Sequence, residues 1–321
     1  MAEDFGTKNE RRQVGTILTR RTILTLGLLF AVLGLASARA ASGTALAQSS
    51  AITCQNEATP AASSSAGTAA SASPTVLEAA FPEGGGQLTV FAAASLTDAF
   101  GKMKTDLEAA HPRLSIAYNF AGSQTLVTQL KEGAQTDVFA SADTMQMNAA
   151  ITNGSIDGNP VTFVHNRLVI VTPKDNPAGI ASAADLAKPG LRLVLAQAEA
   201  PVGRYARQAI CAMHGDTTTY GEAFADHVGG NVVSEEENVR DVLAKVQLGE
   251  ADAGIVYVSD AASAGDDVQR IDIPDAANVL ANYPIAAVNG GNRALADAFI
   301  VYVLSLDGQA TLADFGFEPV S

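Results

Sequence analysis

Residues 88–95, LTVFAAAS, run directly into residues 96–110, LTDAFGKMKTDLEAA. The first stretch is short, apolar and rich in β-forming residues, which predicts a buried strand. The second stretch places apolar residues at helical spacing, which predicts an amphipathic helix. Ser95 stands at the junction, with Asp98 three residues later, in the pattern of a capping box. A hydroxyl and the unpaired N–H groups of a helix start therefore meet at the positive end of a helix dipole, where an anion is favoured.

A second junction of the same kind follows. Residues 114–120, LSIAYNF, predict a strand and residues 124–131 predict a helix, with Ser123 between them. In an open parallel α/β sheet such junctions lie along one edge, where ligands bind. Two junctions on neighbouring strands can therefore aim donors at one small anion. A single junction is weak evidence, because most serve only as helix caps.

Strands and helices alternate along the rest of the chain. Strands are predicted at residues 137–142, 167–172, 191–196, 254–258 and 283–288, and helices at 144–152, 204–213, 235–248, 293–305 and 308–315. Ser234 and Glu237 form a capping-box pattern for the helix at 235–248. This alternation predicts an α/β fold with helices on both faces of its sheets.

The start of the chain carries export signals instead of a fold. The pair Arg20-Arg21 precedes an apolar run at residues 22–35, which is shorter than a membrane span, and small-residue cleavage sites such as 45–47 follow. This pattern predicts a secretory signal peptide over residues 1–47. The paired arginines leave both the general and the twin-arginine export routes open. The protein is therefore expected in the periplasm or at the outer face of the cytoplasmic membrane.

Residues 48–86 are dominated by Ala, Ser, Thr, Pro and Gly, which predicts a flexible linker suited to tethering near a membrane. Cys54 lies in this linker, and the other cysteine, Cys211, lies on a predicted helix. An exported chain can pair its cysteines, but a linker cysteine and a helix cysteine are expected to stay unpaired. A lipid on Cys54 is the other alternative, disfavoured because Ala-Ile-Thr precedes it. The cysteines and histidines have no metal-ligand spacing.

The formal net charge of −14 argues against binding to nucleic acid or to anionic membrane surfaces. It also repels an anionic ligand, so capture must come from local dipoles in a site shielded from water. Asp137 and Asp143 flank the strand VFASA and are expected to cap helices instead of forming an acid–base pair. Arg204 and Arg207 are expected to point to solvent instead of clamping an anion.

Several blocks in this order resemble the molybdate-binding proteins of bacterial ABC transporters: LTVFAAASLTDAF, NFAGSQTLVTQLKEGAQTDVFASAD, NRLVIVTP, PVGRYARQAI, ENVRDVLAKVQLGEADAGIVYVSDA and YPIAAV. The resemblance runs from about Leu88 to Phe317. It implies a bilobal, type II periplasmic-binding-protein fold, in which two α/β lobes joined by two crossing strands close over one tetrahedral oxyanion. Lobe I would comprise residues 87–166 and 283–321, and lobe II residues 167–282, with the crossings around residues 167–172 and 283–288.

The resemblance also implies the ligand-binding residues. Ser95 and Ser123 would offer hydroxyl and backbone donors, Val202 and Val239 backbone N–H groups, and Tyr257 its phenol. Better-known relatives carry alanine at the position of Val202, and some carry serine at that of Gly122. These residues would hold the metal only as molybdate or tungstate, with no direct metal-cation site.

The expected function is to capture molybdate, and tungstate because it is nearly the same size, and to deliver it to the permease and ATPase of an ABC transporter. The protein is expected to be a monomer with no cofactor and no enzymatic activity. One alternative is an exported enzyme with Ser95 or Ser123 as nucleophile, although the sequence lacks a G-x-S-x-G motif and an activating histidine. Another is the same fold with a different oxyanion or an organic acid, which usually recruits arginine.

Overall fold

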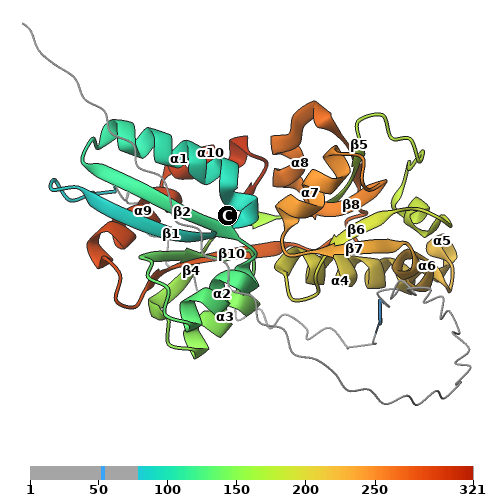
Figure 1. Cartoon of the computed structure of the whole chain (residues 1–321), viewed down its shortest axis with the longest axis horizontal. Coiled ribbons are helices and arrows are strands. Elements are labelled where there is room, and N and C mark those ends of the chain that lie inside the picture. The colour runs from blue at the N-terminus through green and yellow to red at the C-terminus, as the bar shows by residue number, and fades with distance from the viewer. Residues whose placement is uncertain (1–51, 55–78, 321) are drawn as a thin grey trace, which may run out of the picture. The chain divides into compact units, whose positions relative to one another are not determined.

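The computed structural model describes residues 52–54 and 79–320. The predicted signal peptide and most of the predicted linker lie outside these residues. The described chain forms two sheets, each with helices on both faces, as Figure 1 shows. This arrangement confirms the predicted α/β architecture of two lobes.

The first sheet has the strand order β11-β4-β10-β3-β1-β2. β1 pairs in parallel with β2 and β3, whereas β10 pairs in antiparallel fashion with β3 and β4. Helices α1, α9 and α10 cover one face and α2 and α3 cover the other (Figure 1). The bounds are β1 (Gly86–Ala93), β2 (Leu114–Ala121), β3 (Val138–Ala140), β4 (Ile156–Asn166), β10 (Ala281–Val288), β11 (Glu318–Pro319), the 3-10 helix η1 (Ala94–Leu96), α1 (Thr97–Ala110), α2 (Ser123–Lys131), α3 (Thr144–Thr152), α9 (Arg293–Leu304) and α10 (Leu306–Asp314).

The second sheet has the strand order β7-β6-β8-β5-β9. β6 pairs in parallel with β7 and β8, and β5 lies antiparallel to β8 and β9. Helix α4, with α6 beside it, packs on one face, and α7 and α8 pack on the other (Figure 1). The bounds are β5 (Leu168–Pro173), β6 (Leu193–Ala196), β7 (Val232–Glu236), β8 (Ala253–Tyr257), β9 (Val268–Asp272), α4 (Pro201–Gly215), α5 (Thr217–Tyr220), α6 (Phe224–Gly230), α7 (Val239–Gln247), α8 (Val258–Ala264) and the 3-10 helices η2 (Ala183–Ala187) and η3 (Gly265–Asp267).

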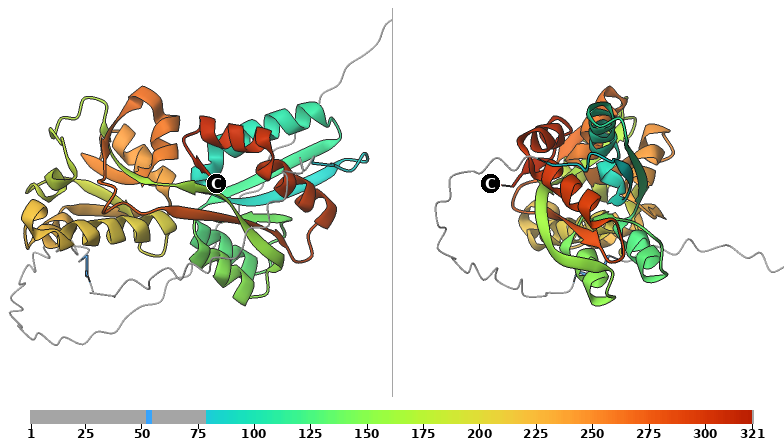
Figure 2. Two further views of the ribbon diagram at one scale, coloured as in Figure 1. Left: turned by 180° about the vertical axis from the view of Figure 1, so that it is seen from behind. Right: turned by 90° about the vertical axis from the view of Figure 1, so that its left-hand side faces the viewer.

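The chain crosses between the sheets twice (Figure 2). It passes from the first sheet to the second at Arg167, between the end of β4 and the start of β5. It returns through residues 273–280, between β9 and β10. The sequence pattern does not predict β4, because Gly158 and Pro160 interrupt the alternation of a strand.

The amphipathic helix predicted after β1 is confirmed. α1 buries Ala99, Phe100, Met103 and Leu107 against the first sheet. The ring of Phe100 lies 5.5 Å from that of Phe299 on α9, centroid to centroid. Each large side chain buried in this way stabilises the fold by about 1.5–3 kcal/mol relative to its exposed state.

No single helix within residues 79–320 is long and apolar enough to cross a membrane. α9 and α10 reach that length and composition only as a pair, bent by 63° at the break between them. The same described residues contain no group of three or more His, Cys, Asp or Glu placed to hold a metal ion.

Cys54 and Cys211 form a disulfide bond, with their Cα atoms 5.3 Å apart. The expectation that they stay unpaired is therefore wrong. Cys211 lies on α4, and Ile52, two residues before Cys54, is only 6% exposed and joins the hydrophobic core. The composition of the linker does not reveal that this segment packs against the fold. Whether the two cysteines pair depends on where the fold places them. The bond occupies the Cys54 sulfur and so excludes a lipid there in this state.

We predict that Cys211→Ser lowers the free energy of unfolding by about 2–4 kcal/mol, because a long cross-link restricts the unfolded chain. Urea unfolding with and without a reducing agent measures the effect, and the reduced wild type should match the variant. Peptide mapping without reduction should recover Cys54 and Cys211 in one cross-linked product. Two alkylatable thiols in the native protein would contradict the pairing.

Candidate oxyanion site between the lobes

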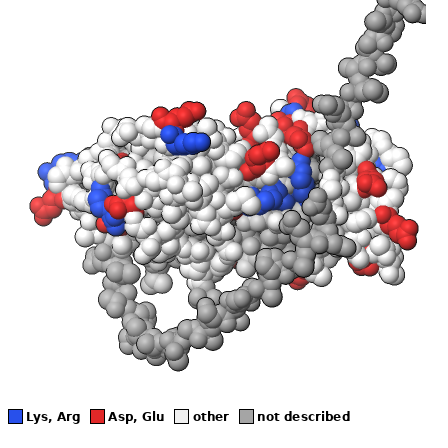
Figure 3. Space-filling model, turned by 90° about the horizontal axis from the view of Figure 1, so that it is seen from below, with Lys and Arg blue, Asp and Glu red and all other residues white. Residues whose placement is uncertain are grey.

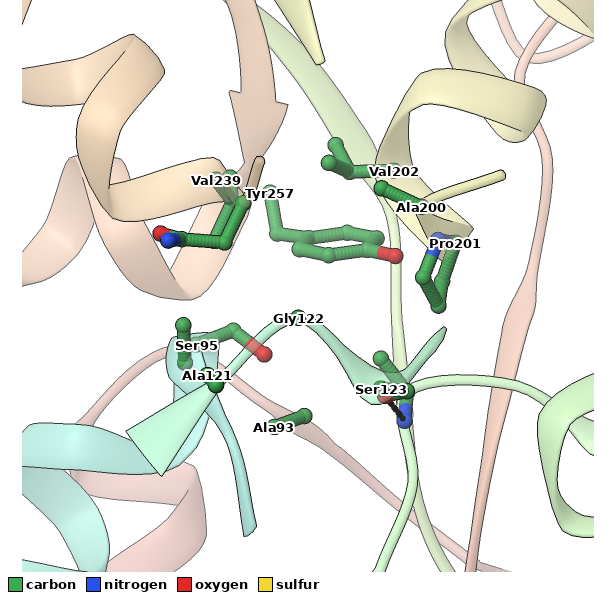
Figure 4. A pocket seen from close by; sticks show the side chains of 13 residues that line it. Ala93, Ser95, Ala121, Gly122, Ser123, Ala200, Pro201, Val202, Val239 and Tyr257 are labelled. Carbon is green, nitrogen blue, oxygen red and sulfur yellow. Dashed lines mark hydrogen bonds between the residues drawn. The ribbon is translucent and has the colours of Figure 1, made fainter. Parts of the chain in front are cut away.

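Four helical starts meet around one cavity between the two sheets (Figure 4). η1 and α2 bring residues of the first sheet's lobe, and α4 and α7 bring residues of the second. The cavity volume is about 20 Å³, above the roughly 10–15 Å³ that holds one water molecule. The space therefore suits a single compact guest. Its lining consists of Ala93, Ala94, Ser95, Ala121, Gly122, Ser123, Ala142, Ala200, Pro201, Val202, Asn238, Val239 and Tyr257.

All five residues predicted for the site lie in this lining: Ser95, Ser123, Val202, Val239 and Tyr257. Figure 4 shows the hydroxyl oxygens of Ser95 and Tyr257 turned toward the space between the two lobes. The residues come from segments up to 162 positions apart in the sequence and from both sheets. The fold thus brings the predicted donors together.

The serines occupy the two strand-to-helix junctions in different ways. Ser123 is the first residue of α2, and its Oγ accepts the Ala142 N–H at 3.0 Å. The Ser95 Oγ lies 2.9 Å from the hydroxyl oxygen of Tyr283, and no side chain caps α1. The predicted capping box of Ser95 and Asp98 is therefore wrong. Asp98 pairs with Arg240 on α7 instead. The Ser95 oxygen can accept the proton of the Tyr283 hydroxyl and direct its own proton into the cavity.

Tyr257, at the end of β8, contributes a phenol that is buried without a partner. Its side chain is 1% exposed, and its hydroxyl has no hydrogen-bond partner among the described residues. Burial raises the pKa of Tyr257 well above its ordinary value, so the phenol keeps its proton and can donate it in a hydrogen bond. An unpaired buried hydroxyl is costly, and an acceptor in the cavity would satisfy it.

Backbone N–H groups supply the remaining donors. The first N–H groups of a helix have no partner inside that helix. Pro201 fills the first position of α4, so Val202 is the first residue of that helix with an N–H to offer. At α7, Asn238 Oδ1 accepts the N–H groups of Arg240 and Asp241, at 2.9 and 3.3 Å. This cap leaves the Val239 N–H for the cavity.

The start of α7 differs from its prediction. The helix predicted at residues 235–248 is confirmed over Val239–Gln247. Its predicted start and its Ser234–Glu237 capping box are wrong, because residues 232–236 form β7. Asn238 is the cap, and its Nδ2 donates to Asp241 Oδ2 at 2.7 Å. The Asn-x-x-Asp pattern at residues 238–241 was the available signal, in competition with the Ser-x-x-Glu pattern beside it. Sequence reasoning also missed Tyr283, which contacts the Ser95 hydroxyl.

None of the described residues that line the cavity is charged. Arg204 and Arg207 are not among the described residues that line the cavity, and their predicted exposure to solvent is wrong. Arg204 pairs with the carboxylate of Asp143, and Arg207 pairs with Glu235 and donates to the carbonyl oxygen of Ala196 at 2.8 Å. On the face shown in Figure 3, too, Lys and Arg side chains lie beside acidic ones. The cavity therefore offers neutral dipoles at the ends of helices.

The aspartates of the predicted pair have separate roles. Asp143 caps α3 by accepting the Gln146 N–H at 2.6 Å, which confirms its prediction. Asp137 caps no helix, so its prediction is wrong. Its carboxylate accepts the N–H groups of Thr89 and Asn292, at 2.7 and 2.6 Å, and joins β1 to the start of α9.

Asp260 on α8 is buried close to the site. Its Oδ2 accepts the Tyr257 N–H at 3.3 Å, and its Oδ1 lies 3.0 Å from Arg240 Nε. Burial raises its pKa from 3.8 to about 7, although Arg240 opposes the shift. The folded protein therefore holds this proton more tightly than the unfolded chain does between these two values.

We predict that this aspartate makes the protein less stable as pH rises from 5 to 7. Relative to Asp260→Asn, the wild type should lose about 2 kcal/mol of unfolding free energy over that interval. Asparagine preserves an acceptor for the Tyr257 N–H and removes the titration. Urea unfolding of both proteins at the two pH values tests this, and parallel pH profiles would refute it.

The chain belongs to the family of bacterial extracellular solute-binding proteins, whose model matches residues 88–318. Among its relatives is the molybdate-binding protein ModA of Mycobacterium bovis, 41% identical over 248 residues that cover 77% of this chain and 90% of the relative. ModA of Escherichia coli is 32% identical and covers 72% and 89%. The solved molybdate-binding protein of Azotobacter vinelandii shares the fold, with a TM-score of 0.63 at 16% identity, covering 73% of this chain and all of that one.

These relatives confirm the resemblance stated from the sequence. They are binding proteins and not enzymes, in agreement with the expectation for this chain. No histidine is among the described residues that line the cavity. Neither Ser95 nor Ser123 is therefore placed beside a base that would activate it as a nucleophile.

Proposed function

We propose that the protein captures molybdate outside the cytoplasmic membrane and hands it to the permease and ATPase of an ABC transporter. The observation that carries this proposal is the cavity in which hydroxyl and backbone donors of both lobes meet, without a charged side chain among the described lining. The names of its relatives at 41% and 32% identity support molybdate as the ligand. Residues 1–47 would direct export of the protein.

The proton state of the ligand favours molybdate over phosphate. Molybdate is fully ionised at neutral pH and offers only acceptors, which suits a cavity of donors. Hydrogen phosphate carries a proton that needs an acceptor, and no carboxylate is among the described lining residues. A buried donor left unpaired costs about 1–3 kcal/mol, which disfavours phosphate by about five- to 150-fold.

The size of the ligand favours molybdate and tungstate over sulfate. Tungstate has the same charge and nearly the same dimensions as molybdate, so we expect it to bind as well. Sulfate is smaller, and its oxygens would not reach donors from both lobes at full hydrogen-bond strength. Charge-assisted hydrogen bonds contribute about 1.5–3 kcal/mol each, so the loss of one or two decides the preference.

A thermal-shift panel of the purified protein with molybdate, tungstate, sulfate and phosphate at equal concentration tests the proposal. Molybdate and tungstate should raise the Tm strongly, because a ligand at about 100 times its Kd stabilises the folded state by about 2.7 kcal/mol. Sulfate and phosphate should produce much smaller shifts. A shift by sulfate or phosphate that exceeds the shift by molybdate would overturn the assignment.

Tyr257→Phe separates stability from binding. The variant should weaken molybdate binding by about 1 kcal/mol, because one donor is lost. The ligand-free variant should be as stable as the wild type or more so, because the hydroxyl that is removed is buried without a partner. Calorimetry and urea unfolding measure the two effects. A less stable variant with unchanged affinity would show that Tyr257 supports only the fold.

A further inference from the structure

The start of α7 is fastened to the first lobe on both sides of Val239. Upstream, the carbonyl oxygen of Glu237 accepts the side-chain amide of Gln124 on α2 at 2.7 Å. Downstream, the guanidinium of Arg240 pairs with the carboxylate of Asp98 on α1. The backbone donor of Val239 is thus held between two contacts that both reach across the cleft.

The start of α4 is fastened in the same way around Val202. Upstream, the carbonyl oxygen of Glu199 accepts the side-chain amide of Gln146 on α3 at 3.2 Å. Downstream, Arg204 pairs with the buried carboxylate of Asp143 at the start of α3. A glutamine amide on a carbonyl and an arginine on an aspartate therefore bracket each of the two valines that offer a backbone donor.

These contacts join the lobes and do not stabilise either lobe alone. In both sets the glutamine and the aspartate belong to helices of the first sheet, and the carbonyl and the arginine belong to the second. Separation of the lobes would break all four contacts at once. The Asp143 carboxylate, which is 0% exposed here, would then lose its cation.

Gly122 makes the approach at α7 sterically feasible. A Cβ atom on Gly122 would lie 2.7 Å from the carbonyl oxygen of Glu237. The backbone of Gly122, with φ −59° and ψ 138°, is open to any residue. In this chain, glycine therefore leaves the space in which the second lobe approaches, and its conformational freedom is not used.

We call these contacts the two latches. The latch at α7 consists of the pairs Gln124–Glu237 and Asp98–Arg240, and the latch at α4 consists of the pairs Gln146–Glu199 and Asp143–Arg204. We propose that the latches hold the lobes closed over the bound oxyanion, position the Val202 and Val239 N–H groups, and set the rate of ligand release. The proposal rests on the proposed oxyanion capture. Arg204 and Arg240 are then positioning residues. Each pairs with an aspartate of the other lobe, and only neutral donors contact the ligand.

The test measures release of labelled molybdate from the full protein after a chase with excess unlabelled molybdate. Asp98→Asn and Arg204→Met should each release it about three- to thirtyfold faster, with association rates changed less than twofold, since a broken interlobe pair acts on dissociation. Asp106→Asn, in an exposed pair on the same helix as Asp98, is the control for α1. Arg192→Met, whose pair with Asp252 lies within the second lobe, is the control for the arginine. Both controls should release at the wild-type rate.

A double-mutant cycle distinguishes a latch from general loosening. Asp98→Asn and Arg240→Met break the same pair, so together they should speed release little more than either does alone. Asp98→Asn and Arg204→Met break different pairs, so their fold-changes in release rate should multiply. The proposal would be overturned if the fold-changes of Asp98→Asn and Arg240→Met multiplied, or if folded variants released molybdate at the wild-type rate.

A second readout does not depend on the ligand. Small-angle scattering of the ligand-free proteins should show a larger radius of gyration for Asp98→Asn and Arg204→Met than for the wild type and the two controls. An unchanged radius would count against the latches. If the wild type fails to bind molybdate, the proposed function falls, and the scattering result alone decides whether the latches hold the lobes closed.

Discussion

Gly203→Ala is expected to cost about 2–4 kcal/mol of unfolding free energy and to weaken molybdate binding at least tenfold. Gly203 lies in the first turn of α4, directly after Val202. A Cβ atom there would lie 2.0 Å from the carbonyl oxygen of Gln197 and 2.4 Å from that of Ala196. Backbone atoms cannot rotate away as a side chain does, so α4 must move off the end of β6. The Val202 N–H would leave the cavity with it.

Gly215→Ala is the matched control, because Gly215 ends the same helix and a Cβ atom there meets nothing within 4 Å. This control should be neutral or more stable by up to about 1 kcal/mol, as alanine restricts the unfolded chain. Urea unfolding and calorimetry with molybdate measure both variants. Wild-type stability and affinity in Gly203→Ala would show that the close approach of α4 to β6 is not required.

The double variant Ser95→Ala/Ser123→Ala should lose at least about 3 kcal/mol of binding free energy, or more than a hundredfold in Kd. Each serine is expected to contribute about 1–3 kcal/mol, since a buried hydroxyl would donate to a charged acceptor. The two side chains are 3% and 1% exposed, so water cannot easily replace the lost hydroxyls. Calorimetry of the single and double variants with molybdate measures the loss.

Ser259→Ala controls for the loss of a buried serine that is not among the residues lining the cavity. Its side chain is 1% exposed, and its Oγ accepts Asn166 Nδ2 at 2.8 Å. This variant should lose stability and retain its affinity for molybdate. The same affinity in the wild type, the double variant and the control would remove both serines from the proposed site.

The elements next to the site follow from local patterns in the sequence. β1 and β2 are short apolar runs that end at small residues, and α1 and α2 repeat apolar residues at helical spacing. Those patterns place Ser95 and Ser123 at strand-to-helix junctions without any tertiary information. The positions of Val202, Val239 and Tyr257 came instead from the family resemblance. The backbone donors of the two valines leave no signature in side-chain chemistry, and a tyrosine at the end of a strand is also common in a core or a cleft wall.

The errors have a common physical origin, namely competition between local and tertiary partners. Asp98 has the spacing to cap α1 with Ser95, but Arg240 in the other lobe is the partner it takes. Although burial alone would raise the pKa of Asp98, the hydrogen bonds from Arg240 and Ser263 lower it. The local sequence around Cys54 likewise predicts a linker, whereas in the fold Cys54 lies next to Cys211 and bonds to it.

The net charge of −14 repels an anionic ligand, so the site needs local donors to overcome that repulsion. Arginines near the cavity are paired with aspartates, and the lining itself is uncharged among the described residues. A doubly charged ligand would thus be stabilised by buried donors that are oriented before it arrives. Such a site selects by shape and proton state more than by charge alone.

The most direct test of this account is a crystal structure of the protein with molybdate. The account predicts that the oxyanion lies in the cavity and accepts hydrogen bonds from the hydroxyls of Ser95, Ser123 and Tyr257 and from the N–H groups of Val202 and Val239. An oxyanion held chiefly by the guanidinium groups of Arg204 or Arg240, or bound elsewhere on the protein, would contradict it.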